Sequence, residues 1–486
     1  MIVKFRLFPL VFVTCGALAH GVDDTPLLAA AYAGDAARVA ALISSGADVN
    51  AANEFGATPL LEAAWRGDTT VLKLLLKAGA DANRANADGE TALMSVARTG
   101  NVAAAELLLR AGARVDAREG WGGQTALIWA AAQDQPQMIR LLAAHGADVN
   151  ARAAVREWQR RVTAEGRPKD MNRGGLTPLL YAAREGYLDA ARVLLAAGAQ
   201  IDLADPDGTT PLILALMNGH FDMARALIDA GADVKLWDWW GQTPLYMAVD
   251  LDTLPTGARV ELPALDHATA LDIMQALIAS GADPNARLKL RPPFRMVSQD
   301  RQSDPSIDIG VTPLFRAAKA ADVPAMKLLL AAGAIVDMPN IFGQTPLMMA
   351  CGIGRGNNPT RGGHQTEAQA IEAARLLLAA GANVNARSAT GETPLHGAAI
   401  KGFSQLVAVL AAAGANLDAV DKDDMSPIDY AMGRFPTRFL ENKPTPYPET
   451  AAALRKLGAR RETPNPPQWP AVGVPRITAE VPVIPY

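Results

Sequence analysis

A repeated Thr-Pro-Leu triplet restricts the fold of this chain more than any other feature of its sequence. Neighbouring copies are in most cases 33 residues apart. A fixed period of roughly 20 to 50 residues is the signature of a repeat architecture. The 486 residues are therefore expected to form one stack of repeats, and not the ~3 separate domains that length alone suggests. The triplet or a close variant begins at Thr25, Thr58, Thr91, Thr125, Thr177, Thr210, Thr243, Thr312, Thr345, Thr393 and Ser426.

Each repeat is expected to hold two α-helices followed by a turn. The Thr of the triplet caps the first helix, and the Pro fits the first turn because that position needs no backbone donor. A Gly-Ala-Asp motif or a close relative follows 21 residues after the Thr in most repeats, as at Gly46 and Gly79. Its glycine is expected to end the second helix, since glycine tolerates the left-handed conformation found there.

This pattern resembles the ankyrin repeat, a unit of about 33 residues with a β-turn, two helices and the consensus T-P-L-H-x-A. The segments TPLHGAA at 393–399 and NGHFDMARALIDAGADV at 218–234 are close to that consensus. The resemblance implies an all-α solenoid of about eleven helix-turn-helix repeats with β-turn fingers, stabilised by the stacking of neighbours. It also implies a non-catalytic scaffold that binds a partner protein through a concave surface of fingers and first helices.

The predicted organisation has three parts. Residues 1–19 form a signal peptide, residues 24–459 form the repeat array, and residues 460–486 form a Pro-rich tail. The tail is expected to be extended or disordered, and it either packs back along the repeats or binds another protein. The repeats are expected to begin near residues 24, 57, 90, 124, 176, 209, 242, 311, 344, 392 and 425.

The first 19 residues have the pattern of a cleavable export signal. A basic start with Lys4 and Arg6 is followed by an apolar run and by an Ala-x-Ala site at 17–19. We predict cleavage after Ala19 and a periplasmic or secreted location. A buried first helix is the alternative interpretation, although Pro9 would interrupt it.

The sequence predicts no catalytic, cofactor-binding or metal-binding site. His267 and His364 lie in insertions, and neither stands at metal-ligand spacing from another His or Cys. Cys351 takes the place of a small alanine between the two helices of a repeat and is expected to be a buried, inert thiol. The 46 basic residues against 50 acidic ones argue against nucleic acid as the main partner. No stretch after the leader reaches the ~18 apolar residues that a membrane span requires, and we predict a monomer.

Insertions interrupt the regular period in three repeats. Repeat 4 gains 19 residues in its outgoing turn, repeat 7 gains 17 between its helices and 19 in its outgoing turn, and repeat 9 gains 15 between its helices. Long loops in a compact array are usually functional or disordered. The insertions at 153–173 and 288–309 are expected to flank the repeats between them as a clamp, or only to keep long loops soluble. In the clamp interpretation, arginines at matching positions of the two insertions supply charge at its sides and bind the partner: Arg152 and Arg287, Arg156 and Arg291, and Arg160 and Arg295.

Aromatic residues concentrate in the turns that precede the triplets. Trp237, Trp239 and Trp240 crowd into one such turn, where the resemblance places the tip of a finger. Aromatic enrichment on an exposed surface marks an interface, so we predict partner contacts there, with packing against the neighbouring finger as the alternative. Further predicted contact residues are Phe55, Trp121 and Phe342 in other turns and Tyr32 and Trp65 on first helices.

Two other functional classes stay open at this point. The first is an enzyme, or an accessory subunit of one, whose site is built by the insertions. A cluster of acids or histidines around His267 and His364 would favour it. The second is a secreted, host-directed effector, since ankyrin arrays recur among such proteins.

Overall fold

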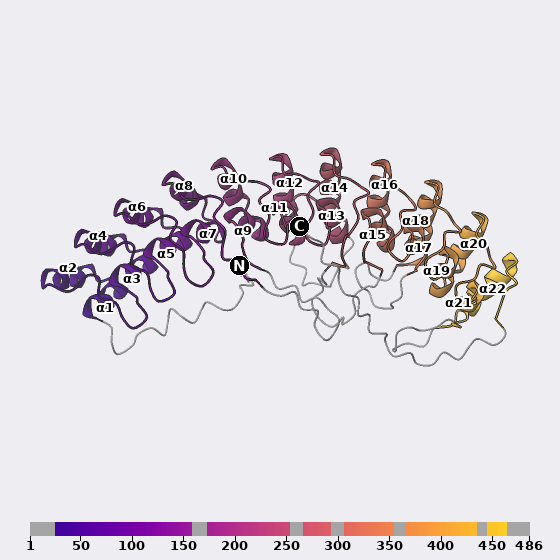
Figure 1. Ribbon diagram of the computed structural model, residues 1–486, viewed down its shortest axis with the longest axis horizontal. Helices are drawn as coiled ribbons and strands as arrows, with labels where there is room; N and C mark the ends of the chain where they lie inside the picture. Colours follow the sequence, from indigo (N-terminus) through magenta and orange to yellow (C-terminus); the bar gives the residue numbers. More distant parts are fainter. Residues whose placement is uncertain are drawn as a thin grey trace. The chain divides into compact units, whose positions relative to one another are not determined.

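The computed structural model describes residues 25–157, 173–252, 266–292, 306–353, 365–434 and 445–463. These residues form 22 α-helices and no β-strand (Figure 1). The helices follow one another as eleven pairs, one in each predicted repeat. The prediction of an all-α stack of about eleven helical repeats is therefore confirmed.

The chain divides into two compact units, Met1–Asp233 and Val234–Tyr486, called unit 1 and unit 2 below. Unit 1 contains α1 (Pro26–Ala33), α2 (Ala36–Ser44), α3 (Pro59–Arg66), α4 (Thr69–Lys77), α5 (Ala92–Thr99), α6 (Val102–Arg110), α7 (Ala126–Ala131), α8 (Pro136–Ala144), α9 (Pro178–Glu185), α10 (Leu188–Ala196), α11 (Pro211–Met217) and α12 (Phe221–Asp229). Unit 2 contains α13 (Pro244–Asp252), α14 (Ala270–Ala279), α15 (Pro313–Ala320), α16 (Val323–Ala331), α17 (Pro346–Ala350), α18 (Glu367–Ala379), α19 (Pro394–Lys401), α20 (Ser404–Ala412), α21 (Pro427–Ala431) and α22 (Pro448–Leu457).

The helix ends follow the local signals in the sequence. In the second repeat the Thr58 hydroxyl accepts from the backbone N–H of Leu61 at 3.2 Å, with Pro59 in the first turn of α3. Asp68 caps α4 in the same way. Gly79, just beyond the end of α4, has a φ of +91°, which only glycine adopts at little cost. A capping box of Thr366 and Gln369 begins α18.

Stacking of like helices builds the core of each unit. In unit 1 the first helices of the repeats, which are the odd-numbered helices from α1 to α11, form one row, and the second helices form another beside it (Figure 1). Ala63 and Ala64 of α3 are fully buried, as are Leu72 and Leu75 of α4. Small residues on the first helix and leucines on the second thus let neighbouring pairs approach closely and exclude water.

The fingers, defined as the turns just before each capping Thr, are held by a side chain at their first position. The Asn53 carboxamide oxygen accepts from the backbone N–H groups of Phe55 and Ala57 at 3.1 and 2.9 Å. Asp238 does the same for Trp240 and Gln242 at 3.1 and 2.8 Å. Neighbouring fingers are also joined by backbone hydrogen bonds, which makes each finger a rigid support for its tip. Such bonds run from Ala87 to Phe55, Gly120 to Asp88, Ala154 to Gly122, Ile341 to Ile309, Ala389 to Phe342 and Lys422 to Thr390.

Candidate functional site

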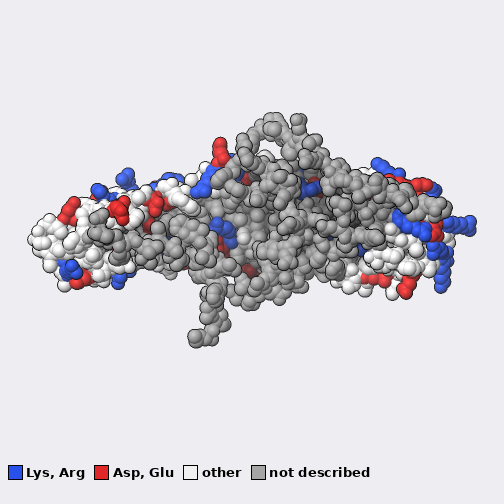
Figure 2. All heavy atoms as spheres, turned by 90° about the horizontal axis from the view of Figure 1, so that it is seen from below, with Lys and Arg blue, Asp and Glu red and all other residues white. Residues whose placement is uncertain are grey.

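Exposed large apolar side chains gather on the fingers in the described part of the chain. Three exposed large apolar residues lie away from the fingers: Trp65, Ile335 and Leu457. On the face shown in Figure 2, basic and acidic side chains are intermixed over the surface that is described. The apolar residues of the fingers and of the turn after repeat 4 are Phe55, Trp121 and Val155 in unit 1 and Trp237, Trp239, Ile309, Ile341 and Phe342 in unit 2.

The three crowded tryptophans do not share one environment. Trp237 and Trp239 are 48% and 42% exposed, whereas Trp240 is 6% exposed. The Trp240 carbonyl accepts from the backbone N–H groups of Lys289 and Leu290 at 2.8 and 3.2 Å. The placement of Trp240 at an exposed tip is therefore wrong, because this residue packs beside the next finger. Trp237 and Trp239 remain accessible, and their partner contacts stay a prediction.

Trp237 lies against a lysine of the neighbouring turn. The ammonium nitrogen of Lys289 is 2.8 Å from the centroid of the Trp237 ring. Desolvation lowers the pKa of Lys289 from its ordinary value. An ammonium over an indole face is stabilised by the ring quadrupole, so this pair presents a defined aromatic and cationic surface.

The arginines of the two matched insertions hold the bases of their own loops. Arg152 donates to the Gly175 carbonyl at 3.2 Å, and Arg287 donates to the Gly310 carbonyl at 3.3 Å. Arg291 forms an ion pair with Asp308. Arg287 also donates to the Pro339 carbonyl of the next finger at 2.9 Å. These three guanidinium groups therefore have structural partners, and a role for them at the sides of a clamp stays a prediction.

Arg156 is arranged differently from the other matched arginines. Its guanidinium carbon lies 5.2 Å from the centroid of the Trp121 ring, and Nη2 donates to the Trp121 carbonyl at 3.3 Å. Trp121 is 61% exposed, so the two form an accessible stacked pair in unit 1. Arg160 and Arg295 lie outside the described residues, and the two insertions belong to different units. The clamp itself therefore stays a prediction.

A second accessible group lies on the first helices of unit 1. The Arg98 guanidinium carbon is 5.0 Å from the ring centroid of Trp65 and 5.5 Å from that of Trp129. The Trp65 indole donates to Glu90 Oε1 at 3.3 Å, and Trp65 is 38% exposed. These residues, Trp65, Glu90, Arg98 and Trp129, are called the arginine–tryptophan cluster below.

Only Trp65 of this cluster was predicted from the sequence. Arg98 occupies the same position as Trp65, seven residues after the capping Thr of its repeat. Trp129 stands four residues after its Thr, one helical turn before that position. The predicted contact residue Tyr32 lies beside the same row, with the Arg66 guanidinium carbon 6.0 Å from its ring centroid. Arg98 could have been predicted as a contact residue because it lies at the same position of its repeat as Trp65.

Unit 2 buries charges on its first helices. Arg316 of α15 donates from Nε to Asp250 of α13 at 2.8 Å, and both side chains are fully buried. Desolvation, together with the neighbouring carboxylate of Asp322, raises the pKa of Asp252 to about 7. Arg316 thus pairs with Asp250, and Asp252 lies beside Asp322, each partner coming from a neighbouring element. No cluster of three or more potential metal ligands occurs among the residues that the structure places.

The histidines of the insertions and Cys351 were the other residues considered for chemical roles. His267 is exposed on the segment that precedes α14, and His364 lies outside the described residues. Cys351 is fully buried at the end of α17, and desolvation raises the pKa of its thiol. A neutral buried thiol is a poor nucleophile, which agrees with the predicted inert role.

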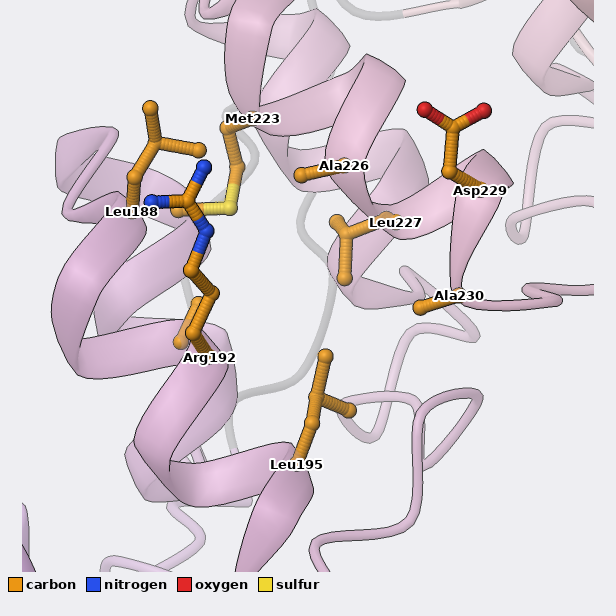
Figure 3. Close-up of a pocket in the computed structure, with 9 residues that line it drawn as sticks. Leu188, Arg192, Leu195, Met223, Ala226, Leu227, Asp229 and Ala230 are labelled. Carbon is orange, nitrogen blue, oxygen red and sulfur yellow. The ribbon is translucent and has the colours of Figure 1, made fainter.

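A groove opens between the second helices α10 and α12 of unit 1 (Figure 3). Its volume is about 410 Å³, and Leu188, Leu195 and Met223 form much of its lining. Arg192 at one rim is paired with Asp189 of its own helix at 3.3 Å. No convergent set of polar groups points into this groove from the residues that line it, so it lacks the features of a small-molecule site.

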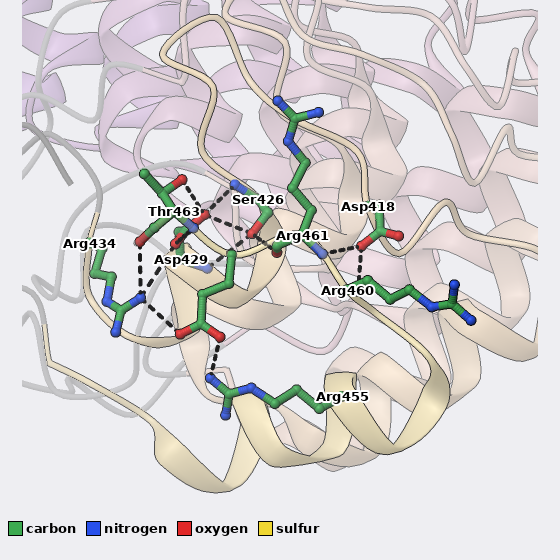
Figure 4. Close-up of polar contacts among 9 residues, drawn as sticks. Asp418, Ser426, Asp429, Arg434, Arg455, Arg460, Arg461 and Thr463 are labelled. Atoms are coloured by element: carbon green, nitrogen blue, oxygen red, sulfur yellow. Dashed lines mark hydrogen bonds and ion pairs between the residues drawn. The ribbon is translucent and has the colours of Figure 1, made fainter. Parts of the chain in front are cut away.

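The first residues of the predicted tail are bound to the last repeats (Figure 4). The backbone N–H groups of Arg460 and Arg461 donate to Asp418 at 2.7 and 2.8 Å, and the Thr463 N–H donates to Asp429 at 3.0 Å. Helix α22 ends at Leu457, shortly before these residues. Residues 460–463 therefore pack on the repeats, while the rest of the tail lies outside the described residues.

Comparison with models of known families matches most of the sequence. A model described as ankyrin repeats in three copies matches residues 7–86, 60–153, 179–288 and 366–437. A model of ankyrin repeats in many copies matches 314–357, and a single ankyrin repeat matches 342–389. The chain belongs to the ankyrin-repeat family. No curated protein matches the sequence.

Ankyrin repeats are in general protein–protein interaction modules. For this ankyrin-repeat protein, family membership supports a protein partner without identifying it. No helix in the placed part of the chain combines the length and apolar character that crossing a bilayer requires. The fingers and the arginine–tryptophan cluster are therefore its candidate interaction surface.

Proposed function

We propose that this ankyrin-repeat protein is a non-catalytic scaffold that binds a partner protein through its fingers and through the first helices of unit 1. The observation that carries the proposal is the concentration of exposed aromatic side chains on the fingers. Trp121 at 61% and Trp237 at 48% exposure leave large apolar areas in water. Accessible aromatic residues on a rigid support are the usual anchors of an interface.

The arginine–tryptophan cluster extends the proposed surface from the fingers of unit 1 onto its first helices. Trp65 is accessible there, whereas the corresponding position of α13 in unit 2 holds the fully buried Asp250. We therefore place the helix-borne part of the binding surface in unit 1. The fingers of unit 2 contribute through Trp237 and Trp239.

We further propose that the protein acts in the periplasm or outside the cell, because its first 19 residues have the pattern of an export signal. An accessory role to an enzyme and a host-directed effector role would use the same surface. Neither is favoured by a cluster of catalytic groups around His267. The partner's identity decides between these roles.

Replacing Trp237 and Trp239 together by alanine is expected to abolish capture of the native partner from the cell envelope. The melting temperature should stay nearly constant, because exposed tip residues contribute little to stacking. The test is affinity capture followed by mass spectrometry and N-terminal sequencing, which should find a mature chain beginning at His20. A matched control is Ile335→Ala with Leu457→Ala, since both are exposed apolar residues outside the fingers.

Three results would contradict these proposals. A large fall in melting temperature with capture intact would show that the finger tryptophans serve packing and not binding. An intact Met1 on the captured protein would contradict export. Equal loss of capture in the control variant would mean that any exposed apolar residue contributes, and that the fingers have no special role.

A further inference from the structure

The guanidinium of Arg98 is held between two indoles without a carboxylate partner. Trp65 of α3 and Trp129 of α7 lie on either side of it, at 5.0 and 5.5 Å from ring centroid to guanidinium carbon. Arg98 forms no ion pair or hydrogen bond within the described structure. The guanidinium carbon thus lies over both indole rings, and its N–H donors lie in the plane of the group.

Arg66 places a second unpaired guanidinium on the neighbouring first helix. It is the last residue of α3, it is exposed, and it stacks near Tyr32. Like Arg98, it has no ion pair among the residues that the structure places. Cations in such positions usually find a carboxylate, because a charge-assisted bond is about twice as strong as a neutral one.

Two acidic residues near this row have hydrogen-bond partners of their own. Glu90 accepts from the Trp65 indole and from the Ser95 hydroxyl, at 3.3 and 2.7 Å. It thereby fixes the ring that flanks Arg98. Asp68, which lies near Arg66, accepts from the backbone N–H groups of Thr70 and Val71 at 2.9 and 3.1 Å. Glu62 is also on α3. The row thus combines two unpaired cations with aromatic rings whose orientation is already set.

We propose that Arg66 and Arg98 bind two carboxylates of an extended acidic segment of the partner protein, with Trp65 and Trp129 packing on apolar side chains of that segment. This inference rests on the proposed binding function. The planar fork of arginine matches a carboxylate bidentately, and tryptophan supplies contact area at low entropic cost. Because the rings hold Arg98 in place before binding, little side-chain entropy is lost when the carboxylate arrives.

Helix spacing sets the spacing of the acids. Packed helices such as α3 and α5 are about 8–10 Å apart, and an extended chain rises ~3.3 Å per residue. The two carboxylates should therefore be about three residues apart in the segment, or slightly more, because the Arg66 side chain extends toward Tyr32 of α1. A single-stranded nucleic acid also favours arginines and aromatic rings, but its continuous phosphate charge would meet the carboxylates of Glu62 and Glu90.

The test measures binding of fluorescently labelled synthetic peptides to the full-length protein by anisotropy. The probe is an extended Pro- and Ala-rich peptide with two glutamates three residues apart, and the peptide control carries glutamines instead. We expect the glutamate peptide to bind and the glutamine peptide to bind about tenfold or more weakly. Affinity for the glutamate peptide should also fall as salt is raised.

The protein variants separate a specific site from general attraction. Arg98→Gln should weaken binding about tenfold or more, and Arg98→Lys should also lose affinity because lysine lacks the fork. Arg140→Gln, an exposed arginine on the second helix α8, is the matched control and should bind normally. Circular dichroism checks that each variant is folded, and Arg66→Gln gives an independent test if an Arg98 variant unfolds.

Three outcomes would overturn the inference. The first is equal affinity for the glutamate and glutamine peptides. The second is equal loss in the Arg98→Gln and Arg140→Gln variants, which would indicate general attraction only. The third is tighter binding of an unstructured oligonucleotide, lost in Arg98→Gln. If the Trp237 and Trp239 variant loses the native partner while Arg98→Gln keeps it, the proposed function stands and this inference alone fails.

Discussion

Replacing Asp250 by leucine is expected to destabilise unit 2 by about 3–5 kcal/mol. Asp250 and Arg316 are both fully buried, and Arg316 Nε lies 2.8 Å from Asp250 Oδ1. Removing the carboxylate leaves a guanidinium in a water-free environment without its counterion. The Arg316 Nη1 and Nη2 atoms are buried and have no hydrogen-bond partner among the placed residues, so little else can compensate for the lost charge.

The double variant Asp250→Leu with Arg316→Met provides the control for this prediction. It removes both charges and fills the space with apolar groups, so it should be much less destabilised than either single variant. Urea unfolding followed by circular dichroism gives the free energies, and the double-mutant cycle isolates the coupling between the two side chains. A cycle in which the two single effects simply add would contradict the assignment of a buried, mutually dependent pair.

Replacing Gly89 by alanine is expected to separate two neighbouring fingers of unit 1. Gly89 has a φ of +81°, and an added Cβ would lie 2.7 Å from the backbone nitrogen of Gly120. That nitrogen donates to the Asp88 carbonyl in the bond that joins the two fingers. The clash should cost about 1–3 kcal/mol, in addition to the ~1 kcal/mol of placing alanine at positive φ.

Gly79→Ala is the matched control for the finger contact. Gly79 has a similar φ of +91°, but an added Cβ there meets nothing within 4 Å. Its cost should be limited to the ~1 kcal/mol of backbone strain. The two variants are compared by their urea midpoints and by the exchange rate of the Gly120 amide. Equal stability of the two variants would show that the finger contact has little energetic weight.

The helical framework could be predicted from the sequence because its determinants are local. The capping bond from Leu61 N–H to the Thr58 hydroxyl and the positive φ of Gly79 depend on residues within one turn of chain. The same signals recur in each repeat, so a single rule located all eleven helix pairs. The buried position of Cys351 followed from its place in the repeat for the same reason.

The details of the candidate site depend on contacts between repeats, which local patterns do not encode. Trp239 and Trp240 are adjacent, yet only Trp240 is covered, because its backbone bonds to the next finger. Arg98 and Trp129 come together from α5 and α7. Arg152 and Arg287 occupy matching positions because they make the same structural bond. Each guanidinium donates to a backbone carbonyl in the turn that closes its own insertion.

The most direct test of the proposed binding surface is amide hydrogen exchange of the full-length protein, alone and with its captured native partner. The partner is predicted to slow exchange in the fingers around 53–57, 119–124 and 237–242 and at the ends of α3 and α5 near Arg66 and Arg98. The second helices α4, α6 and α8 should exchange at unchanged rates. Protection confined to the second helices, such as the groove between α10 and α12, with free exchange in the fingers, would contradict the account.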